Sequence, residues 1–229
     1  MIQRGGWYAG NVFGALLAWI AVAVAVSLWG EGRDRPGVRA AGKLAASAGF
    51  VMLGVWRWSP GDAAGAWIVV GLLLCAAGDG LLLWSRGLDA GLAVFLAGHV
   101  AYIAAFAGAV PVGRWNPWPL VPVVCCSLAA AWWLWPHLGS RRPAVAAYMA
   151  VITVMVWGAV SGALAGVLPP GTAVGAAAFY LSDLAVARNR FVRKAFANRL
   201  VGLPLYYAGQ VLIALAVGRA VPPAVSRLG

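Results

Sequence analysis

The chain has very few charged residues. Only 10% of its 229 residues are Asp, Glu, Lys or Arg, whereas a soluble domain has about 25%. Apolar residues make up 63% of the chain, and the mean hydropathy is +0.85. Such a composition cannot cover a soluble surface, but it provides enough apolar residues for several membrane spans. We therefore expect an integral membrane protein rather than one or two soluble domains.

Histidine and cysteine are also scarce. The chain has two histidines, His99 and His137, and three cysteines in apolar stretches without a Cys-x-x-Cys pair. A metal-dependent hydrolase needs more ligands in one site than this set offers. We therefore expect free thiols that pack as small apolar groups, no metal and no other cofactor. The sequence Gly-x-Ser-x-Gly is missing too, so a serine nucleophile is not expected.

Acidic residues number only six, against 17 Lys and Arg residues, which gives a net charge of +11. Nucleic acid is not the partner that this charge indicates, because the basic residues gather in short segments between apolar runs. If the eight apolar runs described below are numbered along the chain, the connections that follow runs 1, 3, 5 and 7 are the odd-numbered connections. Twelve of the 17 basic residues lie in or beside them, and five lie on the other side of the membrane. By the positive-inside rule, we expect a multi-pass protein of the cell membrane with both termini outside.

Eight apolar segments are long enough to be membrane-spanning helices. We expect one all-α polytopic domain with spans at about 7–29, 40–58, 67–84, 90–110, 118–135, 144–167, 172–188 and 200–219. The first segment is long for a signal peptide and lacks a strongly basic start, so we favour a retained span. The same spacing separates Gly71 from Asp79 and Gly175 from Asp183, which suggests two parallel four-helix repeats.

Two aspartates lie inside apolar segments, GLLLCAAGDGLLLWSR and GAAAFYLSDLAVARNR. Asp79 stands five residues before Trp84, and Asp183 stands five residues before Arg188. Both carboxylates should therefore lie roughly 7–8 Å from the cytoplasmic ends of their helices. An ionisable group inside a membrane is costly and is usually functional. The competing interpretation is that each aspartate pairs with an arginine and only helps packing.

Further polar side chains lie near the inner ends or the middle of the spans. We expect them to line a cavity that opens to the inner leaflet, with these members: Lys43, His99, Tyr148, Tyr206, Tyr207 and Gln210. Lys43 is a candidate for binding phosphate or for an anchor that reaches the interface. His99 is a candidate for moving a proton or for a satisfied core residue. The tyrosines and the glutamine are candidates for binding glycerol or phosphate oxygens, although a tyrosine pair often marks the membrane interface.

Five stretches in a fixed order carry a resemblance to a known family: GDGLLLW, FLAGHVAY, the stretch from Tyr148 to Met155, FYLSDLAVA and LYYAGQVLIAL. Through them the chain resembles the YhhN family of lysoplasmalogenase-like membrane proteins, from Lys43 to the last span. The resemblance implies eight spans and hydrolysis of the vinyl-ether bond of lysoplasmalogens to a fatty aldehyde and a glycerophospho-base. It also implies that Asp79 and Asp183 are the active-site residues. The family's Lys-Pro-Leu reads Lys43-Leu44-Ala45 here, which leaves the role of Lys43 open.

Vinyl-ether hydrolysis needs an acid that protonates the alkene carbon and a base or anion that assists water. Two nearby carboxyls that share one proton can supply both functions. We therefore predict that Asp79 and Asp183 are catalytic on a lysophospholipid, without assigning the proton to either. The alternative is a small transporter or lipid-binding membrane protein that uses the same acids. The head group and the oligomeric state are left open.

Overall fold

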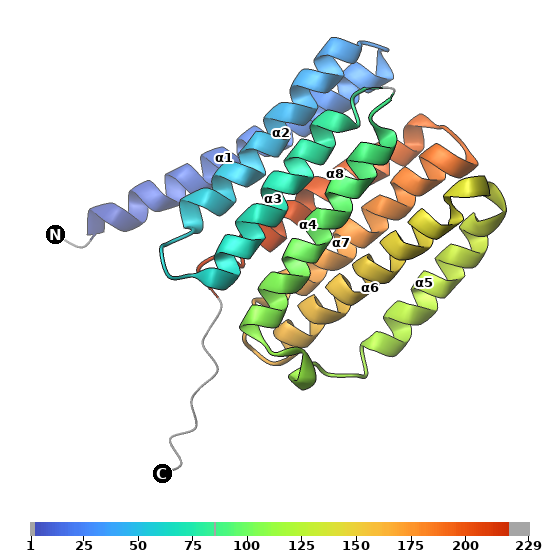
Figure 1. Cartoon of the computed structure of the whole chain (residues 1–229). Coiled ribbons are helices and arrows are strands. Elements are labelled where there is room, and N and C mark those ends of the chain that lie inside the picture. The colour runs from blue at the N-terminus through green and yellow to red at the C-terminus, as the bar shows by residue number, and fades with distance from the viewer. Residues whose placement is uncertain (1–2, 85, 220–229) are drawn as a thin grey trace.

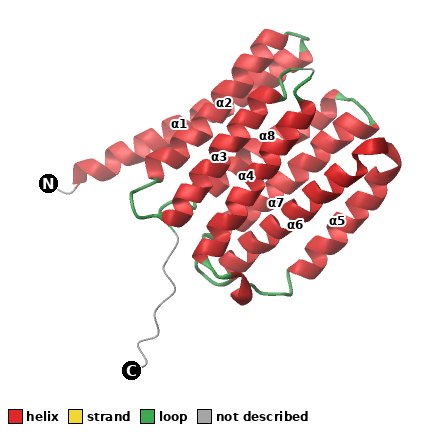
Figure 2. Cartoon of the chain, viewed as in Figure 1, coloured by secondary structure: helices red, strands yellow, loops and turns green. Residues whose placement is uncertain are grey.

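The structure is a computed structural model and describes residues 3–84 and 86–219. In this part of the chain eight long helices form a single bundle (Figure 1). The helices are α1 (Gln3–Gly32), α2 (Pro36–Arg57), α3 (Ala63–Leu81), α4 (Leu88–Ala109), α5 (Leu120–Leu134), α6 (Arg142–Leu164), α7 (Pro170–Ala187) and α8 (Phe196–Ala214). Each expected span coincides with one helix, with ends shifted by a few residues. The described residues contain no strand (Figure 2).

Six of these helices, α1 to α6, are long and apolar enough to cross a membrane. The expectation of a polytopic membrane protein is therefore confirmed for six spans. Helices α7 and α8 are not among the six. They carry the polar side chains of Asp183, Asn198 and Gln210 among others, and these lower their hydropathy. Asn198 and Gln210 are buried, so the bundle rather than the lipid surrounds them.

Neighbouring helices pack as hairpins, and two longer-range contacts close the bundle. The main pairs are α1 with α2, α3 with α4, and α7 with α8, while α4 packs on α6 and α2 on α8. The odd-numbered connections gather at one end of the bundle (Figure 1). The start of α1 and the end of α8 lie at the opposite end. Residues 1–2 and 220–229, which form the two termini, lie outside the described residues.

The contact between α7 and α8 depends on two glycines. A Cβ atom on Gly209 would lie 2.8 Å from the carbonyl oxygen of Gly175, and one on Gly175 would lie 2.9 Å from that of Gly209. Any side chain at either position would push the two backbones apart. Small residues of this kind let helices approach closely in a membrane, where the hydrophobic effect does not drive helix association. The contact fixes Asp183 on α7 relative to Tyr206 on α8.

Candidate active site

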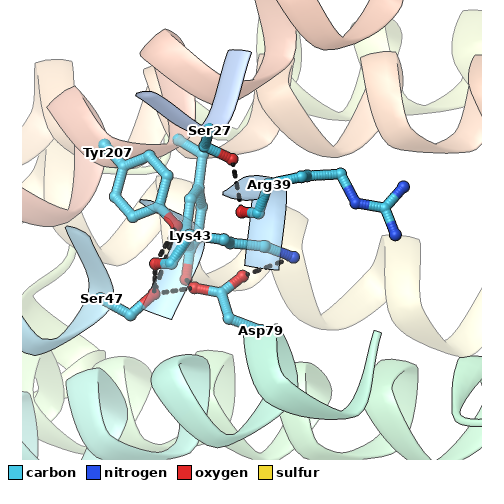
Figure 3. Close-up of polar contacts among 7 residues, drawn as sticks. Ser27, Arg39, Lys43, Ser47, Asp79 and Tyr207 are labelled. Carbon is cyan, nitrogen blue, oxygen red and sulfur yellow. Dashed lines mark hydrogen bonds and ion pairs between the residues drawn. The ribbon is translucent and has the colours of Figure 1, made fainter. Parts of the chain in front are cut away.

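Asp79 lies near the end of α3 and is buried, with 1% of its surface exposed. Its Oδ2 accepts hydrogen bonds from Ser47 Oγ at 2.6 Å and from the Tyr206 hydroxyl at 2.8 Å. Its Oδ1 lies 3.1 Å from Lys43 Nζ, and Figure 3 draws this ion pair as a dashed line. Lys43 and Ser47 are one turn apart on α2 and therefore project from one face of it. The ammonium group offsets a buried carboxylate that would otherwise be very costly.

Tyr207 on α8 holds the segment of α2 that carries Lys43 and Ser47. Its hydroxyl donates to the carbonyl oxygen of Lys43 at 2.9 Å and lies 3.2 Å from Ser47 Oγ (Figure 3). The side chain is 2% exposed and lines neither of the cavities described below. On the other side of α2, Ser27 Oγ of α1 donates to the carbonyl oxygen of Arg39 at 3.0 Å. These bonds hold in place the segment of α2 that presents Lys43 and Ser47 to Asp79.

Asp183 on α7 has different surroundings. Its side chain is 20% exposed, and its Oδ2 accepts a hydrogen bond from the Tyr148 hydroxyl at 2.8 Å. His99 Nε2 lies 3.5 Å from the same oxygen and has no hydrogen-bond partner. His99 Nδ1 lies 2.7 Å from the carbonyl oxygen of Phe95. Because a carbonyl only accepts, we assign a proton to Nδ1, which leaves Nε2 of the neutral ring as an acceptor.

Two cavities meet at Asp183. The first has a volume of about 100 Å³, and its lining includes both aspartates together with Lys43 and Tyr206. The second has a volume of about 510 Å³ and lies between α4, α6 and α7, mostly among Ala, Leu, Val and Ile side chains. Both Asp183 and Tyr148 line both cavities. The site therefore joins a small cavity with two carboxylates to a larger apolar one.

The structure brings five of the eight predicted site residues to the first cavity: Lys43, Asp79, Tyr148, Asp183 and Tyr206. The other three, His99, Tyr207 and Gln210, do not line this cavity, so the expected position is wrong for them. His99 is fully buried behind Asp183, and Tyr207 is in the core. Gln210 accepts a hydrogen bond from the Tyr102 hydroxyl at 2.6 Å and is also fully buried. Hydrogen bonding within the core explains why these three do not reach the cavity.

The contacts of both aspartates, Lys43 and Tyr206 decide between the competing interpretations of these residues. Within the described residues neither aspartate forms an ion pair with an arginine. Lys43 is not an anchor at the interface, because its ammonium group pairs with Asp79. Tyr206 is not an interfacial residue either, because it is 7% exposed and donates to the same carboxylate.

Four residues around the first cavity were missed by the sequence analysis. Ser47 bonds Asp79, and its position four residues after Lys43 could have revealed it. Glu31 Oε2 lies 3.2 Å from Arg39 Nη1, and its Oε1 lies 2.8 Å from Arg199 Nε. Both arginines line the first cavity. Along the sequence both arginines belong to the basic residues that indicate topology, and nothing in the sequence shows that α1, α2 and α8 meet there.

The chain is similar to one protein family and to proteins that are named lysoplasmalogenase. The sequence model of the YhhN family matches residues 38–217. Lysoplasmalogenase TMEM86B of Rattus norvegicus is 34% identical over 172 residues, which cover 74% of this chain and 69% of that protein. Lysoplasmalogenase of Mycobacterium tuberculosis is 30% identical over an alignment of 240 positions, covering 96% of this chain and 87% of that protein. No solved structure matches the chain.

Proposed function

The chain belongs to the YhhN family, and on this premise we propose that it is a lysolipid hydrolase of the lysoplasmalogenase type. Its substrate is a lysoplasmalogen or a related vinyl-ether lysolipid, and its products are a fatty aldehyde and a glycerophospho-base. The relatives that match it carry the name lysoplasmalogenase. The observation that carries the proposal is the pair of carboxylates, Asp79 and Asp183, on one cavity with different partners.

Asp183 is the proton donor in this proposal. Its Oδ2 faces the Nε2 lone pair of His99 at 3.5 Å, and two acceptors in this position repel each other unless a proton lies between them. A proton held by Asp183 and His99 relieves this repulsion. The carboxyl group is also the more exposed of the two and reaches both cavities. It is therefore placed to protonate a substrate carbon, a role that suits a positioned carboxylic acid.

Asp79 acts as the fixed anion. Lys43, Ser47 and Tyr206 all donate to its carboxylate, and such donors stabilise the ionised form. An anion in a fixed position stabilises positive charge that develops in a transition state nearby. The same oxygens can accept a proton from an attacking water. Lys43 is then a positioning residue, because it acts on the substrate only through Asp79.

The reaction proceeds in three steps. Asp183 transfers its proton to the alkene carbon next to the ether-bearing carbon, and the electron pair of the double bond forms the new C–H bond. The ether-bearing carbon becomes an oxocarbenium ion, which Asp79 stabilises. A water molecule adds to this carbon and loses a proton to the carboxylates. The hydroxyl group of the resulting hemiacetal then gives its proton to a carboxylate and becomes the aldehyde carbonyl. The bond to the glycerol oxygen breaks at the same time, this oxygen takes up a proton from a carboxyl group, and the aldehyde is released.

The second cavity suits the hydrocarbon chain of such a substrate. Its volume of about 510 Å³ lies within the usual range of about 300–1,000 Å³ for small-molecule sites. Its lining includes Leu92, Ala147, Ile152 and Leu184 from three helices. A chain that enters between these apolar side chains brings the adjoining vinyl ether to Asp183, which lies where the two cavities meet.

We also propose that all eight helices cross the membrane, that both termini lie outside, and that α1–α4 and α5–α8 are parallel repeats. Corresponding helix pairs support the repeats, because α3 packs on α4 as α7 packs on α8, and α2 packs on α8 as α6 packs on α4. The glycines at corresponding positions of the two halves, Gly71 with Gly175 and Gly98 with Gly209, make similar helix contacts. A Cβ atom on Gly98 would lie 3.4 Å from the carbonyl oxygen of Gly71, in the same place as the Gly175–Gly209 contact.

The two halves of the site follow the same pattern. Asp79 is contacted from the preceding helix, α2, and from α8. Asp183 is contacted from its preceding helix, α6, and from α4. Each carboxylate thus has one partner in its own half and one in the last helix of the other half. The repeats therefore supply two equivalent carboxylates, whose partners differ and allow different functions.

A panel of lysolipids tests the proposed activity. Purified protein is incubated with vinyl-ether, alkyl-ether and acyl lysolipids of the same chain length, and released aldehyde and fatty acid are quantified. We expect aldehyde from the vinyl-ether lysolipid alone, because only an alkene carbon can accept the proton. Release of fatty acid from the acyl lysolipid, without aldehyde from the vinyl ether, would overturn the proposal.

A further inference from the structure

Three arginines line the first cavity, at the end of the bundle that holds the odd-numbered connections. They are Arg39 on α2, Arg190 in the α7–α8 connection and Arg199 on α8. We call them the arginine cluster. In the part of the chain that the structure describes, Glu31 is the single carboxylate that pairs with them, and it contacts both Arg39 and Arg199. Three guanidinium groups with one carboxylate leave the cluster with an excess of positive charge.

The cluster also has unused hydrogen-bond donors. Arg39 Nε is buried and has no hydrogen-bond partner. Figure 3 shows the Arg39 side chain extending past the pair of Lys43 and Asp79, with its guanidinium turned away from that carboxylate. Within residues 3–84 and 86–219, Arg190 makes no ion pair. Because buried donors normally have partners, Arg39 Nε indicates a ligand with acceptor oxygens. Arg190 is exposed, so its guanidinium group can reach the same ligand.

A widened turn places Arg190 at the cavity. Residues Arg188–Val192 form a π-helical turn that continues α7, and the amide of Arg193 donates to the carbonyl oxygen of Arg188 at 2.8 Å. The side chain of Asn189 fixes the turn, because its Oδ1 accepts from the amide of Ala195 at 3.1 Å. Turns of this type are frequent at functional sites. Here the turn brings Arg190 to the lining of both cavities.

We propose that the arginine cluster is the binding site for the phosphodiester group of the lysolipid. This inference rests on the proposed function and adds the orientation of the substrate. A guanidinium group donates two parallel hydrogen bonds, a geometry that matches the oxygens of a phosphate. With the phosphodiester at the arginine cluster and the hydrocarbon chain in the second cavity, the vinyl ether lies between them, beside Asp183.

Kinetics on two substrates test this assignment. A lysoplasmalogen carries the phosphodiester, whereas a 1-alkenylglycerol of the same chain length has the same vinyl ether without it. We expect Arg190→Gln and Arg199→Gln to raise the KM for the lysoplasmalogen roughly tenfold or more, the value of one charge-assisted hydrogen bond. The kcat for the lysoplasmalogen and both constants for the alkenylglycerol should stay within about threefold of the original protein, since the bond to be broken is unchanged.

Lys194→Gln is the matched control, because Lys194 belongs to the same connection, is exposed and lines neither cavity. Arg190→Gln breaks no ion pair, so it stays informative if Arg199→Gln fails to fold. An equal rise in KM for both substrates, or the same rise in Lys194→Gln, would overturn the assignment. Neither outcome would contradict the proposed hydrolysis of the vinyl ether.

A binding measurement separates this inference from the proposed activity. Calorimetry on the purified full chain in detergent compares glycerophosphoethanolamine, which carries the phosphodiester, with inorganic phosphate. We expect glycerophosphoethanolamine to bind, with affinity lowered roughly tenfold or more by Arg190→Gln and unchanged by Lys194→Gln. Binding of inorganic phosphate alone, or binding that Arg190→Gln does not change, would refute a head-group site. Because no turnover is needed, the result holds whatever reaction the aspartates catalyse.

Discussion

Replacing Lys43 by methionine should destabilise the protein. The change keeps the apolar stem and removes the ammonium group that lies 3.1 Å from Asp79 Oδ1. Breaking a buried ion pair by removing one partner costs about 3–5 kcal/mol. Asp79 would keep the hydroxyls of Ser47 and Tyr206, so we expect a loss of about 2–3 kcal/mol. For a chain of this length that corresponds to a melting temperature lower by about 5–10 °C.

A double-mutant cycle separates the ion pair from other effects. Asp79→Asn alone should cost less, about 1–2 kcal/mol, because the Asn side chain can accept from the same hydroxyls. The ammonium group of Lys43 then loses its partner, but its side chain is 15% exposed and can turn to water. Adding it to Lys43→Met should restore about 2 kcal/mol, since the buried carboxylate is then gone. Thermal unfolding in detergent, followed by tryptophan fluorescence, measures all four proteins, with Lys194→Met as the control. A Lys43→Met protein as stable as the original, or a double variant whose losses simply add, would refute the reasoning.

The remaining predictions concern the site and the topology. Tyr148→Phe removes the 2.8 Å hydrogen bond to Asp183 and should lower kcat for aldehyde release roughly 10- to 100-fold; unchanged turnover would exclude a role for this hydroxyl. Ala147→Trp fills the second cavity and should raise the KM for long-chain lysoplasmalogens more than for short-chain ones, whereas Ala146→Trp, outside both cavities, should not; equal effects would contradict a chain site. A reporter fused after Gly229 should report the outside, and a cytoplasmic signal would reverse the orientation.

Much of the helical framework could be predicted from the sequence. Apolar runs of membrane length placed all eight helices, because length and hydropathy are local properties of the chain. The shared setting of Asp79 and Asp183 also predicted that they would come to one cavity. Both results depend only on spacing along helices and on the direction in which each helix runs. These features do not require knowledge of which helices touch.

The partners of the two aspartates could not be predicted in this way. The spacing of Lys43 on α2 does not show that α2 packs on α3 and α8, where Asp79 and Tyr206 lie. The sequence predicts two nearby carboxyls that share one proton. The structure instead gives Asp79 a cation of its own, Lys43, whereas Asp183 has no Lys or Arg partner among the described residues. The arginine cluster could not be predicted for the same reason, because its members come from separate helices and from the α7–α8 connection.

The central claim is that Asp183 supplies the proton for vinyl-ether hydrolysis while Asp79 provides the fixed negative charge. The most direct test is aldehyde release from a lysoplasmalogen per folded molecule of Asp183→Asn. We predict that kcat falls by roughly two or more orders of magnitude, the scale of general acid–base catalysis. The melting temperature should stay close to that of the original protein, because Asp183 makes no ion pair with Lys or Arg in the described part of the chain. Normal turnover in the folded variant would contradict the claim.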